Sequence, residues 1–535
     1  MGKHMLEREL KLHVPPGRRS ALESELRELG AADIELAARY FDTPDGRLGQ
    51  AGIALRLRLE GKQWVQTIKA PGPDELSRVE INHPRPKPEL DLGLYDNTSM
   101  APFFAGLAHA PEQLYETRVR RLVLRQDTGD GAIEFAYDQG VIIAGRFELP
   151  LCELELELIS GNADQLFTVG AEWLEKYDLI LDLRSKAERG NGLAHLAGTA
   201  SGQDGTGRRT DFPAMQAHQL FSPRRAGAIA LEAGMSLAQV YLRCINECMN
   251  HIVRNATLLA GTESQYVSPE LSAGYVHQLR VGIRRLRSCW RFFGKWLPVR
   301  DSVLESELRR YFSLLGQARD ADIIRLHIEP RLMDAGMPAL APPSRPEGTG
   351  ADMDHADMRT LAASAAFQSC LLTLLEHTVA TVSPAPQARP KADSAEHARA
   401  GDTAQALRKR LNKWLNRLCT EGEHSSSLPA TEQHRLRKKT KRLRYCLEFS
   451  ASLLERKRRR RVQRALAAVQ EELGRLNDLY LAQTHYTPQA ALQPQALFAL
   501  GWLQAMQEQA QTRAETTFKK LANAGRLKKK KASAR

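Results

Sequence analysis

The chain of 535 residues has a net charge of +13 and is long enough for two or three domains with their own hydrophobic cores. It contains no run of about 18 apolar residues that would predict a membrane span, and its start lacks the apolar stretch of a signal peptide. Its seven cysteines form no CxxC pair, which favours reduced thiols and a cytoplasmic location over a disulfide-stabilised secreted protein.

The charge is distributed unevenly along the chain. Residues 1–200 contain 24 Lys and Arg against 32 Asp and Glu, whereas residues 201–535 contain 52 against 31. This asymmetry predicts a mildly acidic domain followed by a strongly basic one, with different electrostatic tasks.

Short segments that alternate between apolar and polar residues dominate the first 160 residues and predict β-strands. The first strand is expected over 5–14 and is followed by a helix from Arg18 to Leu29, which ends at Gly30. Further strands are expected at 35–41, 53–60, 64–69, 75–81, 117–126, 132–137, 140–148 and 152–159. About eight strands with a few helices predict an α+β fold, built as an antiparallel barrel or a strongly curved sheet.

Charged residues occupy alternate positions in five of these strands. They are Glu7, Glu9 and Lys11; Arg56 and Arg58; Arg78 and Glu80; Arg118 and Arg120; and Glu153, Glu155 and Glu157. Alternate residues share one face of a strand, so each charged face is either solvated or part of a polar lumen. In a closed sheet, such a lumen is stable only when cations neutralise the carboxylates and a polyanion neutralises the guanidinium groups. Arg binds phosphate through paired hydrogen bonds and carboxylates suit Mg²⁺, so the pattern predicts metal-dependent phosphoryl transfer on a small polyphosphate.

An ordered set of motifs resembles the CYTH (triphosphate tunnel metalloenzyme) family over about residues 5–195. The motifs are Glu7-x-Glu9-x-Lys11, Tyr40-Phe41-Asp42-Thr43-Pro44, Leu55-Arg56-Leu57-Arg58, Gln66-Thr67-Ile68-Lys69, Cys152-Glu153-Leu154-Glu155-Leu156-Glu157 and Ser185-Lys186-Ala187-Glu188-Arg189-Gly190. The resemblance implies an eight-stranded antiparallel tunnel that hydrolyses or cyclises triphosphates with Mg²⁺ or Mn²⁺.

The resemblance also implies roles for individual residues. The implied catalytic residues are Glu7, Glu9 and Lys11, and the implied metal ligands are Glu7, Glu9, Glu155 and Glu157, with Glu153 nearby. The implied triphosphate ligands are Lys11, Arg56, Arg58, Lys69, Arg78, Arg118, Arg120 and Lys186. Asp138 is expected to orient a basic side chain. The stretch from Tyr40 to Pro44 can equally be a turn that ends a strand.

The second half of the chain is organised differently. Residues 197–213 are rich in Gly, Ser and Thr and predict a flexible linker, and helical periodicity begins near Pro223. Two Pro-rich stretches, 336–350 and 384–393, are expected to be loops. The predicted organisation is a tunnel domain at 1–196, a linker at 197–222, an all-α bundle at 223–522 and a basic tail at 523–535.

A basic motif in this half occurs twice, 157 residues apart. His277-x-x-Arg280-x-x-x-Arg284-Arg285-Leu286-Arg287 recurs as His434-x-x-Arg437-x-x-x-Lys441-Arg442-Leu443-Arg444, and the segment 315–320 has a counterpart at 473–478. The recurrence predicts an internally duplicated helical bundle. Positions i, i+3, i+7 and i+10 lie within about 80° of arc on a helix, so each copy forms one basic stripe. Because acidic neighbours are nearly absent, a polyanion-binding groove is favoured over a solvated cationic face.

The two copies resemble the CHAD (conserved histidine α-helical) domain over about residues 225–520. The resemblance implies two four-helix halves whose basic groove binds inorganic polyphosphate. The implied ligands are His277, Arg280, Arg284, Arg287, His434, Arg437, Lys441 and Arg444. The two histidines are expected to form hydrogen bonds rather than bind metal, since no carboxylate or Cys accompanies them at ligand spacing.

The combined prediction is a cytoplasmic enzyme that hydrolyses inorganic triphosphate to diphosphate and phosphate and binds polyphosphate, with association with polyphosphate granules as a further expectation. Deletion of residues 214–535 is expected to spare turnover. The alternatives are hydrolysis of thiamine or nucleoside triphosphates, an adenylate cyclase, a noncatalytic polyphosphate scaffold and a basic nucleic-acid adaptor. A membrane partner is not expected, because no membrane span is predicted. Sequence-specific nucleic-acid recognition is not expected either, because the aromatic interleaving that stacks bases is absent.

Overall fold

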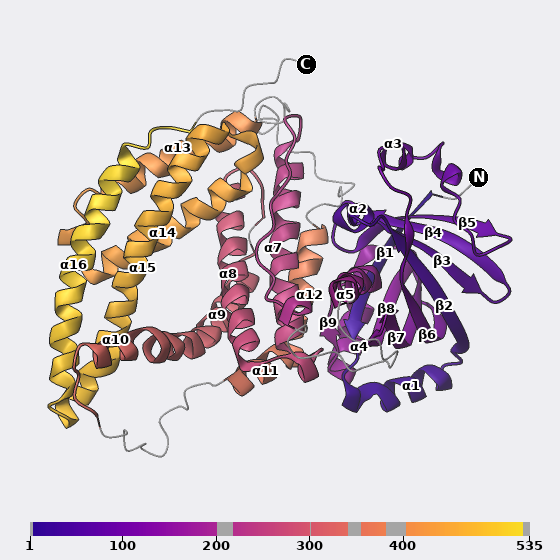
Figure 1. The fold of residues 1–535 in the computed structure, drawn as a ribbon, viewed down its shortest axis with the longest axis horizontal. Helices are drawn as coiled ribbons and strands as arrows, with labels where there is room; N and C mark the ends of the chain where they lie inside the picture. The colour runs from indigo at the N-terminus through magenta and orange to yellow at the C-terminus, as the bar shows by residue number, and fades with distance from the viewer. Residues whose placement is uncertain (1–3, 201–217, 300, 341–354, 381–402, 528–535) are drawn as a thin grey trace. The chain divides into compact units, whose positions relative to one another are not determined.

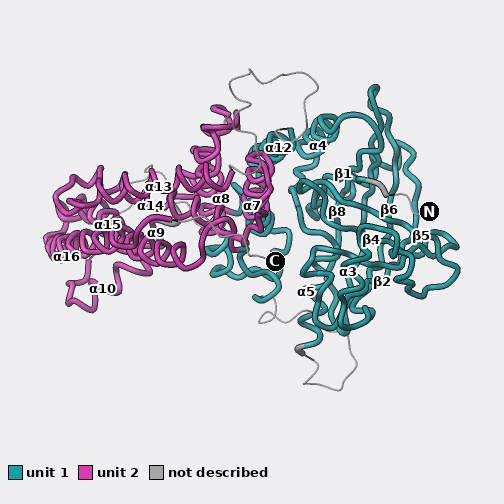
Figure 2. The backbone as a smooth tube through the Cα atoms, turned by 90° about the horizontal axis from the view of Figure 1, so that it is seen from above, with its two compact units in different colours: residues 1–224, 252–275, 359–380 teal, residues 225–251, 276–358, 381–535 magenta. Residues whose placement is uncertain are grey.

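The computed structural model describes residues 4–200, 218–299, 301–340, 355–380 and 403–527. Two compact units make up the described chain (Figure 2): unit 1 within residues 1–224, 252–275 and 359–380, and unit 2 within 225–251, 276–358 and 381–535. Most of the predicted linker, all of the 384–393 loop and the last eight residues of the basic tail lie outside the described residues.

Eight strands of unit 1 close into an antiparallel barrel (Figure 1). They are β1 (His4–His13), β2 (Ala32–Asp42), β3 (Ala54–Glu60), β4 (Gln63–Pro71), β5 (Ser77–Arg85), β6 (Glu112–Asp127), β7 (Ala132–Ala144) and β8 (Phe147–Ser160). The order around the barrel is β5-β4-β3-β2-β6-β7-β8-β1, and pairing of β1 with β5 closes it. The predicted eight-stranded antiparallel barrel is confirmed. A ninth strand of two residues, β9 (Ile180–Leu181), pairs with the end of β1.

In most of these strands the apolar face points outward, where helices cover it; β2 and β6 are exceptions, because their outer faces carry charged residues such as Asp33, Arg118 and Arg120. Leu55, Ile68 and Ile81 form a buried cluster with Tyr95 between the barrel wall and its short helices. On another side of the barrel, Gly170 lies so close to Leu10 that a Cβ would collide with the leucine side chain. The helices and turns around the barrel are η1 (Pro16–Arg18), α1 (Arg19–Glu28), α2 (Arg47–Gln50), η2 (Leu92–Tyr95), α3 (Ala101–Ala105), α4 (Ala163–Tyr177) and α5 (Lys186–Ala200). The polar faces of the other strands, among them β1, β3, β5 and β8, therefore point into the barrel.

Strand β7 runs without a break where two strands, 132–137 and 140–148, are predicted. Gly140 is a signal for a turn in sequence, yet here it pairs with Val119 within the β6–β7 ladder. A Cβ at Gly140 would collide with the backbone carbonyl of Arg118. The glycine is therefore required for close approach of two strands rather than for a turn.

Two segments that follow residue 224, 252–275 and 359–380, also belong to unit 1 (Figure 2). The first contains the end of α7 (Leu237–Leu259), η3 (Ser264–Tyr266) and the start of α8 (Pro269–Phe293). The second contains the end of α11 (His355–Ala363) and α12 (Ala365–Ala380). Helix α12 packs against α4 and β9.

Unit 2 is helical, as predicted. Besides most of α7 and α8 it contains α9 (Ser302–Ile323), η4 (Ile324–Ile328), α10 (Glu329–Asp334), α13 (Thr403–Gly422), η6 (Ser425–Ser427), α14 (Ala430–Phe449), η7 (Ala451–Leu453), α15 (Arg456–Leu492) and α16 (Ala496–Ala522). Leu476, Leu479 and Tyr486 of α15 pack against Ala499 and Leu503 of α16. The two copies of the basic motif lie within α8 and α14.

Among the described helices, none is long and apolar enough to cross a membrane by itself, and only the bent pair α11–α12 meets these criteria jointly.

Candidate functional site

The strand register brings opposite charges together inside the barrel. Lys11 of β1 lies opposite Glu155 of β8, and Glu9 lies opposite Glu157. Lys69 of β4 lies opposite Glu80 of β5. Directly opposed residues of antiparallel strands share a face, with Cβ atoms about 5 Å apart. The alternation seen in the sequence and the pairing of distant strands therefore combine to build a charged interior.

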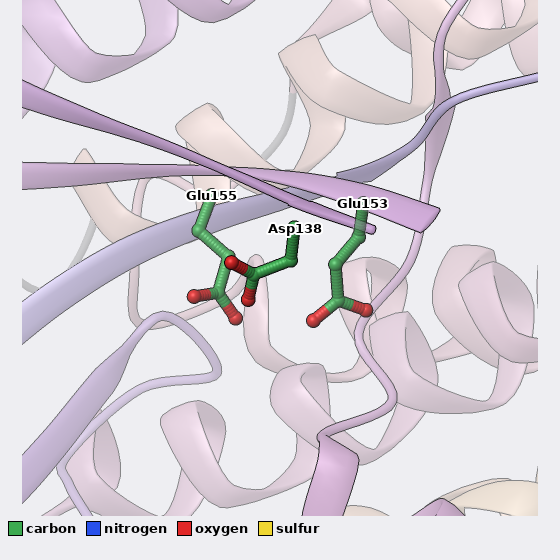
Figure 3. Close-up of side chains that lie close together, drawn as sticks. All are labelled: Asp138, Glu153 and Glu155. Atoms are coloured by element: carbon green, nitrogen blue, oxygen red, sulfur yellow. The ribbon is translucent and has the colours of Figure 1, made fainter. Parts of the chain in front are cut away.

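An acidic triad of Asp138, Glu153 and Glu155 forms one cluster in this interior (Figure 3). One carboxylate oxygen from each lies within 4.8 Å of the others, close enough for a single metal ion. In this structure the Lys186 Nζ occupies the centre, 2.7 Å from Asp138, 2.5 Å from Glu153 and 2.9 Å from Glu155. Burial favours neutral Glu155, but the ammonium groups of Lys11 and Lys186 outweigh it and hold the pKa of Glu155 well below its usual value.

Two arginines complete the surroundings of the triad. Arg121 holds Asp138 through paired hydrogen bonds of 2.6 and 2.7 Å and also donates to Glu155 at 2.9 Å. Arg189, in the first turns of α5, forms an ion pair with Glu153. Each carboxylate of the triad is thus neutralised by cations of the protein itself.

A second cluster, which we call the Lys69 cluster, consists of Lys69 with Glu7, Glu9, Glu80 and Glu157. Lys69 Nζ lies 2.6 Å from Glu7, 2.9 Å from Glu80 and 3.9 Å from Glu9. Three carboxylates therefore lie within 4 Å of one ammonium group, Glu157 is a further electrostatic neighbour, and the only other cation within this distance of the four is Lys11, 3.6 Å from Glu9, among the described residues. Burial, opposed by Lys69 and reinforced by Glu9 and Glu80, raises the pKa of Glu7 to about 9. Glu7 is consequently protonated more readily than an ordinary glutamate.

The Lys69 cluster fits a divalent cation by this chemistry. Hard carboxylate oxygens are the preferred ligands of Mg²⁺ and Mn²⁺. The cluster has more negative groups than its own cation can neutralise, and burial also raises the pKa of Glu157. A divalent cation would compete with the proton that this environment favours on Glu7.

Arginines of β3 line the same interior. Arg56 lies opposite Tyr40, whose ring stacks on Tyr115 with centroids 4.8 Å apart. Among the described residues the buried Nε of Arg56 has no hydrogen-bond partner. Arg58 pairs with Glu60, and burial together with the Arg56 charge lowers its pKa. Both guanidinium groups therefore lie where they can donate hydrogen bonds to an anionic ligand.

The stretch from Tyr40 to Pro44 is both a part of this wall and a turn. The buried Asp42 carboxylate accepts hydrogen bonds from the backbone N–H groups of Thr43, Leu48 and Gly49, at 2.7 to 2.8 Å. Asp42 thereby fixes the chain reversal into α2, whereas Tyr40 contributes to the interior.

The structure brings together most, but not all, of the predicted tunnel residues. Glu7, Glu9, Lys11, Arg56, Arg58, Lys69, Glu155, Glu157 and Lys186 face one interior. Arg78 lies on the interior register opposite Glu7, and its Nη1 donates to the backbone oxygens of Glu75 and Ser77 at 3.2 and 2.8 Å.

Arg118 and Arg120 require a correction, because they lie on the outer face of β6. Arg118 is paired with Glu116, and its side chain is 59% exposed. Arg120 forms ion pairs with Asp33 and Glu23 at 2.8 and 3.1 Å. The residues of β6 that face the interior are Arg121 and those separated from it by an even number of positions. Arg121 itself lies opposite Asp138 of β7.

Sequence reasoning missed Arg121 and Arg189 as neighbours of the triad. The available signal was Asp138 itself, a carboxylate in a strand that is otherwise largely buried. A buried carboxylate requires a cationic partner, and Arg121 is its cross-strand neighbour. Asp138 does orient basic side chains, as the sequence predicts.

In unit 2 the two basic stripes are close enough for their charges to repel one another. The charges of Arg284 in α8 and of Arg437 in α14 both affect Lys441. Burial, with Arg437 and Arg284 adding to it, lowers the pKa of Lys441 to about 6. The buried Nε atoms of Arg284, Arg437 and Arg444 have no hydrogen-bond partner among the described residues. Cations from both motif copies therefore converge without full compensation.

Other predicted residues of the stripes lie in the same two helices. The guanidinium of Arg280 lies 4.6 Å from the ring centre of Phe312, and Arg287 Nη2 lies 3.9 Å from Glu305. His434 Nδ1 lies 3.0 Å from the Asn477 side-chain oxygen, which fits a hydrogen-bonding role. His277 is in α8. The side chains of residues 317–319, in the segment that precedes Asp320, are outside the described part of the chain.

A cavity of about 620 Å³ lies between α14 and α15 beside the second stripe. His434, Arg437 and Lys438 line it on one side, and Leu473 and Leu476 on the other. None of its described lining residues is Asp or Glu. Its electrostatic character thus favours an anion.

The closed barrel with its interior of paired charges defines a triphosphate tunnel fold. Residues 5–190 match the CYTH domain family, and residues 244–487 match the CHAD domain family. The chain therefore consists of an N-terminal CYTH domain and a C-terminal CHAD domain, and CYTH enzymes are metal-dependent.

Relatives of both parts are known. An inorganic triphosphatase from Haemophilus influenzae is 31% identical over 193 residues, which cover 34% of this chain and 54% of the relative, about half its length. A CHAD domain from the plant Ricinus communis is 27% identical, covers 58% of this chain and 99% of its own, and has a TM-score of 0.42. A Hippeastrum protein, described as an adenylyl cyclase candidate with a dominant triphosphatase activity, is 17% identical over 38% of this chain and 100% of its own, with a TM-score of 0.28.

Proposed function

We propose that the barrel hydrolyses inorganic triphosphate to diphosphate and phosphate with Mg²⁺ or Mn²⁺. The observation that carries this proposal is the excess of carboxylates over cations in the Lys69 cluster, next to interior lysines and arginines. The distant likeness to an inorganic triphosphatase supports the choice of substrate. The proposed catalytic domain extends over residues 1–196, followed by a linker at 197–222, a helical domain at 223–522 and a basic tail at 523–535.

In this proposal Glu7, Glu9, Glu155 and Glu157 hold the metal. When bound, the metal offsets phosphate charge and lowers the pKa of water that attacks phosphorus. Glu7 gives up its proton on metal binding, because its carboxylate then has a cationic partner.

The basic interior residues bind the triphosphate chain. Lys11, Lys69 and Lys186 exchange their carboxylate partners for phosphate oxygens, while Arg56, Arg58 and Arg78 supply guanidinium donors. Phosphoryl transfer spreads charge over the transferred group, so cations that are already fixed in place stabilise the transition state without reorganising. The acidic triad keeps Lys186 and Lys11 in position before the substrate arrives.

The proposed role of the CHAD domain is to bind inorganic polyphosphate and keep it close to the enzyme, with association with polyphosphate granules as a consequence. Partly uncompensated cations in α8 and α14, together with a cavity free of Asp and Glu among its described lining residues, support this role. We further propose that the two motif copies are the product of an internal duplication, since they recur 157 residues apart on helices.

Phosphate release from inorganic triphosphate, ATP and thiamine triphosphate, each with Mg²⁺ or Mn²⁺, tests the proposal. Inorganic triphosphate is expected to give the highest kcat/KM, and Glu7→Gln is expected to lower kcat by about 100-fold, because one metal ligand is lost. The matched control is Glu116→Gln on the outer face of β6, which keeps full turnover. Preference for an organic triphosphate, or no turnover with bound triphosphate as expected of a scaffold, would contradict the proposal.

A further inference from the structure

The short strand β9 and the loop that follows it connect the barrel to helices from the second half of the chain. Ile180 and Leu181 pair with His13 and Leu12 at the end of β1. The backbone N–H of Asp182 donates to the carbonyl oxygen of Lys11 at 3.0 Å. The segment is therefore bonded directly to the strand that carries Glu7, Glu9 and Lys11.

Two buried side chains of unit 1 hold β9 from its other side. The amide oxygen of Gln368, in α12, accepts a hydrogen bond from the Leu181 N–H at 2.9 Å. The hydroxyl of Thr257, in α7, donates to the Leu181 carbonyl at 2.6 Å. Both side chains are fully buried. The backbone N–H and carbonyl of Leu181 are thus hydrogen-bonded to residues far away in the sequence.

A buried ion-pair network continues along the loop. Arg184 bonds to Asp182 at 2.7 and 2.9 Å, and its Nη2 lies 3.4 Å from Glu263 and 3.3 Å from the Thr262 hydroxyl. The exposed fractions are 1% for Asp182, 6% for Arg184 and 5% for Glu263. Removing one partner of such a buried set leaves an uncompensated charge, so the network holds the loop in one conformation.

This loop leads directly into the first turn of α5, which carries two cations of the acidic triad. Lys186 contacts all three triad carboxylates, and Arg189 forms an ion pair with Glu153. The Arg189 N–H donates to the carbonyl of Ser185, the one residue between Arg184 and the start of α5 at Lys186. The position of Arg184 thus sets where Lys186 enters the interior.

We propose that Arg184 and Glu263 are a positioning pair for the tunnel, through which residues 252–275 of the CHAD-side sequence fix Lys186 against the acidic triad. The inference rests on the proposed triphosphatase activity and deepens it. The pair touches neither substrate nor metal, and it acts through Lys186. The functional catalytic unit therefore includes parts of α7, η3 and α12 besides the barrel.

The test uses the full chain with Glu263→Gln, which removes the charge and keeps the side-chain volume. Loss of a residue that positions a substrate-binding side chain without touching the substrate is expected to lower kcat/KM for inorganic triphosphate by about tenfold. On a Lys186→Met background the same change is expected to cost less than about twofold, because the residue through which it acts is already gone. Thr262→Val, which removes only a hydroxyl next to Arg184, is expected to give a smaller loss in the same direction.

Hydrogen exchange gives a readout that does not depend on activity. Glu263→Gln is expected to speed amide exchange in residues 182–190, whereas Glu448→Gln is expected to leave both exchange there and turnover unchanged. The control removes the partner of the equally buried Arg285 in unit 2. An equal loss of kcat/KM on both backgrounds, or unchanged exchange in residues 182–190, would overturn the positioning role. If Glu263→Gln speeds exchange in residues 182–190 but the wild-type protein does not hydrolyse triphosphate, only the proposed function is overturned.

Discussion

The barrel of unit 1 and the paired stripes of unit 2 use the same cationic residue types in opposite ways. In the barrel, carboxylates within 3 Å overcome burial and raise the pKa values of Lys69 and Lys186. In the helical unit, burial and neighbouring arginines lower the pKa of Lys441 to about 6. The barrel site contains carboxylates that outweigh burial, whereas at Lys441 the single opposing carboxylate, Asp478, is outweighed by burial and neighbouring arginines.

This difference indicates which kind of ligand each site favours. A ligand of the barrel must displace carboxylates from the lysines, and it must arrive with a metal that accepts those carboxylates. A ligand of the helical unit only needs to bring negative charge, because relief of repulsion is itself favourable. We therefore expect metal-dependent, short-chain selectivity in the barrel and metal-independent binding of long polyanions in the helices.

Removal of divalent metal is the strongest way to separate the two sites. Full-length protein treated with EDTA is expected to lose phosphate release from triphosphate completely, because the carboxylate-rich Lys69 cluster then repels the substrate. Polyphosphate retention in a pull-down with the same sample is expected to persist, since cations outnumber the carboxylates around Lys441 and bind phosphate without a metal. Equal loss of both functions would show that the sites do not differ in this way.

The sequence predicted the charged interior but not which charges belong to it. Period-two alternation at Arg118 and Arg120 is as regular as at Arg56 and Arg58, yet the first pair faces outward. The deciding information is the register of β6 against β7, which places Arg121 opposite Asp138, and register depends on residues remote in sequence. The helical stripes were easier to predict, because a helix fixes its own periodicity locally.

The contacts of β9 could not be predicted for the same reason. Leu181 depends on Gln368 and Thr257, which lie 187 and 76 residues further along the chain. The sequence also predicts that deletion of residues 214–535 spares turnover. Because that deletion removes Thr257, Glu263 and Gln368, we now expect it to lower turnover.

Arg437→Met tests the uncompensated state of the helical unit. Loss of one converging cation is expected to weaken polyphosphate binding by about tenfold at low salt and to reduce the slope of log affinity against log salt by about one. Affinity titrations at several salt concentrations measure both quantities. Arg417→Met is the matched control, because Arg417 is a solvent-exposed helical arginine in unit 2 that is paired with Glu421. A parallel loss in the control would indicate a general effect of net charge.

The pH dependence of unit 2 follows from Lys441, which faces Arg284 of α8, Arg437 and Arg444 of α14, and Asp478 of α15. Its pKa is lowered from 10.5 to about 6 in the folded chain. The unfolded chain therefore binds more protons between these values, and the contribution of Lys441 to stability is lost as pH falls from 10.5 towards 6.

Bound polyphosphate reverses this shift, because it supplies the missing counter-charge. At pH 8 we expect binding to take up about one proton, which calorimetry in buffers of different ionisation enthalpy measures. Lys441→Met is expected to abolish most of that uptake while leaving triphosphate turnover unchanged. Undiminished uptake in the variant would assign the proton to another group.

The smallest effect is expected for the two arginines that the sequence placed inside the barrel. Arg120→Met removes surface ion pairs with Asp33 and Glu23, and exposed pairs of this kind contribute at most about 1 kcal/mol. We expect kcat/KM for triphosphate to stay within about twofold of wild type, because the side chain lies outside the interior. Arg121→Met, one position further, is expected to lower it strongly, since Asp138 and Glu155 lose their guanidinium partner. If the two variants behaved alike, the register that separates the inner from the outer face of β6 would be in error.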